Sequence, residues 1–166
     1  MPSGTTTGLP GWRDAGCNLL LQTFIWGKAP VAQEIKRITL NWQKDLHFQG
    51  GEADKPAILI DGDNAAGPGP MLTLLLAAAS CTGSDVVLVL RKMRVELTQL
   101  SIEVACTRRE QEPRRYLAIH FLYRIGGAGL DETKARRAID LSLEKYCSVI
   151  HSLAPDIAIT YELALL

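Results

Sequence analysis

The longest apolar segment of the chain limits most strongly what this sequence can fold into. From Met71 to Met93, apolar residues fall on nearly every side of a helix until Asp85. A helix that is hydrophobic all round is buried on most of its surface. One chain of 166 residues with a few short strands offers too little cover for it. We therefore expect a homodimer, because soluble monomers rarely expose so large an apolar patch.

The segments on either side of this helix alternate between apolar and polar residues, as strands do. Such runs occur at 38–48, 57–60, 100–106, 117–124 and 157–163. A second helix is predicted from Asp131, a favourable N-cap residue, to Pro155, which ends it. The order ββ–α–ββ–α–β predicts an antiparallel α+β domain over residues 35–166. Residues 1–34 follow neither pattern, and we expect a poorly ordered leader or arm.

The charge balance gives no sign of a polyanionic partner. Lys plus Arg and Asp plus Glu each number 18, so no global field attracts nucleic acid or an anionic membrane. No stretch reads as the ~20 apolar residues that a membrane helix needs, and no secretory signal is recognisable. We therefore expect a cytoplasmic protein with no nucleic-acid or membrane partner.

The chain has four cysteines, Cys17, Cys81, Cys106 and Cys147. None forms a C-x-x-C pair, so the common zinc spacings are absent, and no metal or cofactor is expected. On periodicity alone, packing in the core is the simpler interpretation for Cys81 and Cys147. Cys106 lies on the inward face of its strand and is predicted to be structural. Cys17 lies in the leader and is interpreted as incidental.

The histidines offer one alternative chemistry. His151 follows Cys147 by four positions, so a hydrolytic Cys–His pair on one helix face is geometrically allowed. No acid partner or oxyanion motif accompanies it. His120 falls on the outer face of its strand.

The sequences around two of the cysteines resemble those of the OsmC/Ohr family. Around Cys81 the similar segments are Gly69–Met71, Leu74–Thr82, Asp85–Val87 and Leu90–Arg94. Around Cys147 the similar segments are Arg137–Ser142 and Glu144–Val149. Thr107–Glu110 with Pro113–Arg114 resembles the linker of the YhfA-like branch. The resemblance spans residues 35 to 163.

This resemblance implies a fold and a chemistry. Family members are intertwined homodimers in which antiparallel sheets wrap two central helices. By analogy, Cys81 is the thiol that attacks an organic hydroperoxide, and Cys147 closes a disulfide with it, which a dithiol reductant reopens. We expect a pocket for a small apolar hydroperoxide, lined by the residues Met71, Leu74, Ala78 and Val149.

The chain departs from the active branches at their activating pair. Those branches hold an arginine beside the first cysteine with a glutamate that follows the helix-opening proline. Here Met71 and Leu72 follow Pro70, and 44–48 contains no arginine. We therefore expect slow reaction with peroxide unless Arg108 or Arg109 approaches from a partner chain. The alternative function is a non-catalytic module that binds a small molecule.

Overall fold

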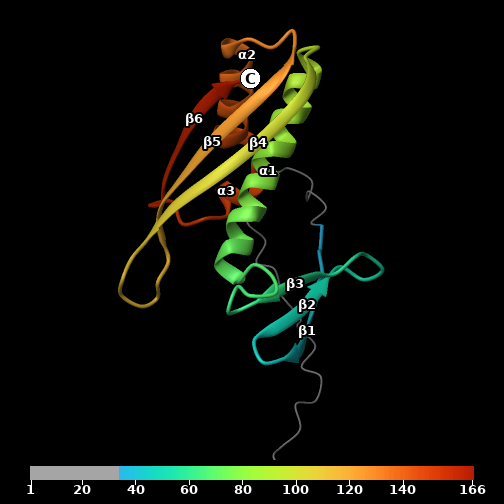
Figure 1. Ribbon diagram of the computed structural model, residues 1–166, viewed down its shortest axis with the longest axis vertical. Helices are drawn as coiled ribbons and strands as arrows, with labels where there is room; N and C mark the ends of the chain where they lie inside the picture. The colour runs from blue at the N-terminus through green and yellow to red at the C-terminus, as the bar shows by residue number, and fades with distance from the viewer. Residues whose placement is uncertain (1–33) are drawn as a thin grey trace, which may run out of the picture. The chain divides into compact units, whose positions relative to one another are not determined.

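The computed structural model describes residues 34–166 (Figure 1). The chain divides into two units, 1–36 and 37–166, and the second contains every helix and strand below. The prediction for the leader at 1–34 falls almost entirely outside the described residues. The elements, in chain order, are β1 (Thr39–Lys44), β2 (His47–Gly51), β3 (Ile58–Asp61), α1 (Pro70–Lys92), β4 (Glu96–Arg108), β5 (Tyr116–Ala128), α2 (Glu132–Leu141), the π-helical turn η1 (Ser142–Tyr146), α3 (Ser148–His151) and β6 (Ala158–Leu165).

The first sheet is a small antiparallel one, ordered β1-β2-β3. The alternation at 38–48 was expected to form a single strand, and this is corrected to a hairpin. Asp45 turns the chain with φ at 44°, in the left-handed region that Asp tolerates better than most residues. Trp42 Nε1 donates a hydrogen bond to the Asp45 carbonyl at 2.9 Å, which braces this turn.

The second sheet is ordered β4-β5-β6 and carries the core. β4 and β5 pair antiparallel, whereas β6 runs parallel to β5. The α+β class is confirmed, but the expectation of wholly antiparallel pairing is corrected at this strand. The physical reason is the connection: helical segments carry the chain back along the sheet after β5, so β6 starts where β5 starts.

The helices α1 and α2 pack beside each other on the inner face of this sheet (Figure 1). The inward residues of β5 and the helix residues that cover them are almost fully buried: Ile119, Phe121, Tyr123, Ile125, Val86, Leu90, Ala135, Ala138 and Ile139. The inward alternation predicted for β5 fails only at Leu117, which is 40% exposed. Thr107 and Arg108 pair with Ala118 and Tyr116, so the register skips Leu117 and Tyr116 takes the buried place.

The outer part of β4 corrects the prediction for Cys106. Ile102 and Val104 are half-buried, as predicted, but every residue from Ala105 to Arg108 is exposed. β4 runs past the helical cover at this point, so Cys106 is not a core residue of the described chain. Strand alternation gives the direction of a side chain, not whether another element covers it.

The central helix α1 was predicted to be buried on most of its surface, and the described chain buries it only in part. Six of its residues are buried, and Leu72, Leu76 and Leu88 are about half exposed. By length and composition α1 could cross a membrane, so the expectation that no segment reaches that length is corrected. The core helix of a globular protein can have the same length and composition, and α1 packs along β4.

Candidate functional site

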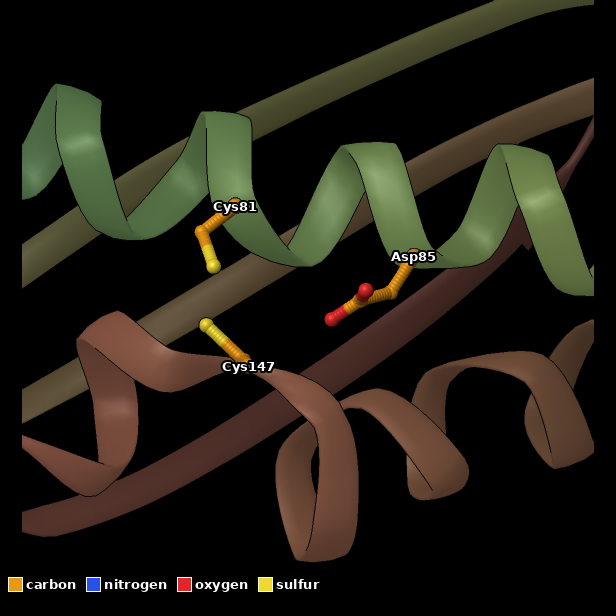
Figure 2. A group of neighbouring side chains, drawn as sticks. All are labelled: Cys81, Asp85 and Cys147. Carbon is orange, nitrogen blue, oxygen red and sulfur yellow. The ribbon is translucent and has the colours of Figure 1, made fainter. Parts of the chain in front are cut away.

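Three side chains that can do chemistry converge between α1 and the segment after α2. Cys81 and Asp85 are one turn apart on α1 and project from the same face. Cys147 faces them from the break between η1 and α3 (Figure 2). The two sulfurs and a carboxylate oxygen of Asp85 all lie within 4.8 Å of one another. The two cysteines predicted to pair are therefore brought together, and both are free thiols.

Cys147 reaches this position because its helix is interrupted. A continuous helix from Asp131 to Pro155 was predicted, and this is corrected. Ser142–Tyr146 forms a π-helical turn, closed by a bond of 2.9 Å from Cys147 N to Ser142 O. Cys147 itself has ψ of 98°, outside the helical region. The extra residue of a π turn changes the direction of the side chains at its end. Tyr146, the last residue of this turn, is 47% exposed.

The Cys147 sulfur is enclosed on all sides. The residue is completely buried, and its sulfur accepts a hydrogen bond from Ile150 N at 3.4 Å, at the start of α3. Burial raises the pKa of this thiol to about 11, and the nearby Cys81 adds to the rise, against the lowering effect of the Ile150 and Val149 N–H groups. No Lys or Arg is among these main influences, so Cys147 is a neutral thiol at neutral pH.

Asp85 was missed as a site residue by the sequence interpretation. It appeared there only as the first polar interruption of the apolar helix. Its carboxylate Oδ2 accepts a 2.8 Å hydrogen bond from the hydroxyl of Ser142, a fully buried residue of η1. Its spacing of four residues from Cys81 was the available signal. The π turn thus begins at Ser142, whose hydroxyl orients the carboxylate, and ends directly before Cys147.

Tyr123 of β5 adds a buried hydroxyl that sequence reasoning assigned only to packing. The residue is fully buried, and its Oη has no hydrogen-bond partner among residues 34–166. Burial raises its pKa to about 12. The neighbouring Thr82 side chain lowers the pKa through a hydrogen-bonding interaction, and Cys147, Tyr161 and Asp85 raise it further. Because Cys147 and Asp85 act on this hydroxyl electrostatically, it lies near both groups.

The four residues predicted to line a substrate pocket do not all border the same hollow. Met71 and Leu74 line a hollow of about 420 Å³ together with Arg108, Tyr116, Leu153 and Ile157, and neither Cys81 nor Cys147 borders it. Ala78 is completely buried, and Val149 is partly exposed and packs against the core. The assignment of these four to substrate binding stays a prediction.

The alternative hydrolytic pair gains no support from the geometry. His151 is exposed, whereas Cys147 is buried. Within the described part of the chain, no side-chain hydrogen bond joins them. The nucleophile and base of a hydrolytic pair need such a contact.

Comparison with known proteins agrees with this architecture. Residues 61–162 match the family model described as OsmC-like protein. Protein YhfA of Escherichia coli K12 is 36% identical over 123 residues, which cover 74% of this chain and 92% of YhfA. A crystal structure of a hypothetical protein from Aquifex aeolicus VF5 has a TM-score of 0.70 at 30% identity, covering 81% and 99% of the two chains.

A more distant likeness concerns the fold alone. The organic hydroperoxide resistance protein OhrB of Bacillus subtilis has a TM-score of 0.53 at 15% identity, covering 79% of this chain and 98% of OhrB. The paired cysteines, the fold and the YhfA similarity agree, and this chain belongs to the OsmC family, in its YhfA-like branch.

Proposed function

We propose that the protein is a cytoplasmic thiol redox protein that reduces organic hydroperoxides through a disulfide between Cys81 and Cys147. One observation carries this proposal: the two sulfurs approach within 4.8 Å from separate helical segments. A disulfide needs about 2.05 Å between its sulfurs. Side-chain rotation with a small shift of the chain at Cys147 would close the gap. The OsmC family membership supports a redox role.

The proposed reaction has three balanced steps. The Cys81 thiolate attacks one oxygen of the hydroperoxide, the O–O bond breaks, and an alcohol leaves after taking up a proton. Cys81 is then a sulfenic acid. The sulfur of Cys147 attacks it, the S–S bond forms, and the thiol proton leaves with the sulfenic oxygen as water. A dithiol reductant then reduces the disulfide by thiol–disulfide exchange, which restores both cysteine thiols and oxidises the reductant.

The electrostatics of the site set the expected rate. A cation beside a cysteine favours its reactive thiolate, and an anion does the opposite. The arginine and glutamate of the active branches are absent from the expected positions of this sequence, at 44–48 and after Pro70. We therefore expect slow peroxide reduction.

Counting thiols tests this proposal. A Cys17→Ser/Cys106→Ser background leaves only the pair, because the chain has four cysteines. The reduced protein is mixed with cumene hydroperoxide, and free thiols are counted until the reaction ends. Loss of both thiols, with no change in mass beyond two hydrogens, supports the proposal. Retention of both thiols contradicts it and favours the binding module.

The assembly is part of the proposal. Half-exposed Leu76 and Leu88 of α1 border an apolar hollow of about 650 Å³, which Leu100 and Ile102 of β4 also line. We propose that a second copy of the chain covers this surface, because apolar residues gather there on adjoining elements. Light scattering at micromolar concentration should give the mass of two chains. The mass of one chain would contradict the dimer.

A non-catalytic binding function is the second candidate. The hollow beside Met71 and Leu74 is separate from the cysteine pair, and its lining is mostly apolar with arginines at its edge. Such a site suits a small apolar molecule with an acidic group. Protein that retains its thiols in peroxide but binds an apolar carboxylate by calorimetry would favour this second function.

A further inference from the structure

We propose that reduced Cys81, Asp85 and Cys147 bind a thiophilic divalent cation, with Zn²⁺ as the best-suited ion. The inference goes beyond the proposed redox function and does not depend on it, although it uses the same two sulfurs.

The geometry of the three groups fits a tetrahedral ion. Zinc–sulfur distances of ~2.3 Å and zinc–oxygen distances of ~2.1 Å imply roughly 3.6–3.8 Å between ligand atoms. The three ligand atoms lie within 4.8 Å of one another, so contraction by about 1 Å assembles the site. Two ligands share a helix face at a spacing of four residues, and the third stands at a helix break (Figure 2). That break gives Cys147 the freedom to adjust.

The cluster offers a cation a carboxylate with no competing ion pair. No ion pair within residues 34–166 involves Asp85. Binding of an ion to the two sulfurs would release their thiol protons. Ser142 donates to Oδ2 of Asp85, and no hydrogen bond among these residues reaches Oδ1. One carboxylate oxygen is thus held by an outer donor while the other is available, which is how proteins orient metal-binding carboxylates.

The buried hydroxyl of Tyr123 is a second polar group to consider. It is fully buried and has no hydrogen-bond partner within residues 34–166. A tetrahedral ion with three protein ligands keeps a fourth position for water. A water molecule there would give the Tyr123 hydroxyl the hydrogen bond it lacks. The phenol would in turn hold that water in place.

The ligand set selects the kind of ion. Soft thiolates favour Zn²⁺ over Mg²⁺ or Ca²⁺, which prefer oxygen ligands. An ion bound to both sulfurs also prevents them from forming a disulfide. Metal occupancy and oxidation should therefore exclude each other, and bound zinc would protect the pair from peroxide.

Cobalt substitution tests the site directly. Co²⁺ is added without oxygen to the reduced Cys17→Ser/Cys106→Ser protein, in which the three ligands are intact. We expect one ion per chain, sulfur-to-cobalt absorption in the near ultraviolet and intense visible bands of a tetrahedral ion, all removed by Zn²⁺. A weak octahedral spectrum, or no binding, would overturn the proposal.

Matched variants identify the ligands. Asp85→Asn keeps an acceptor for Ser142 but loses the carboxylate, and we expect affinity to fall by more than roughly tenfold. Asp140→Asn makes the same change on α2, where the carboxylate accepts a bond from Tyr161, and should bind as the parent does. Tyr123→Phe should retain the sulfur-to-cobalt absorption and shift the visible bands. Parent-like binding by Asp85→Asn would rule out this ligand set.

The two proposals fail separately. Cobalt binding without peroxide-driven disulfide formation would sink the redox function and leave the metal site. Disulfide formation without tetrahedral cobalt would do the reverse.

Discussion

The two helical segments that carry the cysteines hold their thiol side chains in position in different ways. α1 is an uninterrupted helix of 23 residues, and Cys81 occupies a position in its middle. The second segment is α2, a π turn and the short α3, and Cys147 stands at the break between the last two. A regular helix holds a side chain at a rigid position, whereas a break aims one at a position that the regular repeat would not reach. One cysteine is therefore fixed and the other adjustable.

The largest expected effect comes from removing either cysteine in the Cys17→Ser/Cys106→Ser background. Cys81→Ser should retain its remaining thiol in hydroperoxide, because no nucleophile is left to attack the O–O bond. Cys147→Ser should instead accumulate a sulfenic acid at Cys81, detected by mass after trapping with a cyclic dione. A protein in which Cys147 alone is oxidised would reverse the roles assigned to the two segments.

Restoring a regular helix tests the role of the π turn. Deletion of the exposed Glu144 removes one residue from η1. We expect the helix to continue with normal bonding and to rotate Cys147 away from Cys81, so that disulfide yield with excess peroxide falls at least roughly tenfold. Circular dichroism checks that helix content persists. Replacement of the same residue by alanine is the control and should leave the yield unchanged.

The continuous helix should carry more of the stability. Leu90 of α1 is completely buried, and Leu90→Ala should lower the free energy of unfolding by about 2–5 kcal/mol through lost burial and an unfilled cavity. Urea denaturation measures this change. Glu144→Ala, a substitution at the surface, is the comparison and should change the free energy of unfolding by about 0.5 kcal/mol or less. A loss below about 1 kcal/mol for Leu90→Ala would show that the helix repacks more freely than its burial indicates.

The smallest expected effect concerns how the two segments begin. α1 starts with Gly69 and Pro70 and has no side-chain cap, whereas the Asp131 carboxylate accepts a 2.8 Å bond from Lys134 N at the start of α2. That bond is the main cause that lowers the pKa of Asp131. A lowered pKa stabilises the fold above the pKa of the unfolded chain, and this gain is lost as pH falls through the folded pKa.

Asp131→Ala should accordingly lower the urea midpoint modestly at pH 7, and the difference from the parent should shrink in acid. Asp131→Asn keeps a capping oxygen without the charge, and its urea midpoint at pH 7 should lie between those of the parent and Asp131→Ala. A difference between parent and Asp131→Ala that is constant from neutral to acid pH would contradict the electrostatic contribution of this cap.

Much of the fold could be predicted from local patterns. The central helix, the N-cap at Asp131 and the inward face of β5 from Ile119 onward are consequences of residue spacing, because a regular helix or strand has a constant repeat. Where the chain leaves that repeat, the patterns fail. The turn at Asp45, the skipped Leu117 and the π turn each shift the register by local events. Beyond such a point, the spacing of residues along the sequence no longer indicates on which face a side chain lies.

The sequence by itself determined the family, the apolar central helix and the choice of Cys81 and Cys147, since these depend on which residues are present and in what order. Only the tertiary structure decided that the two sulfurs meet beside Asp85, that Ser142 orients this carboxylate, and that Tyr123 leaves a hydroxyl unpaired among residues 34–166. It also decided that Cys106 is exposed and that β6 runs parallel to β5. These properties depend on contacts between residues far apart in the chain, which no local periodicity encodes.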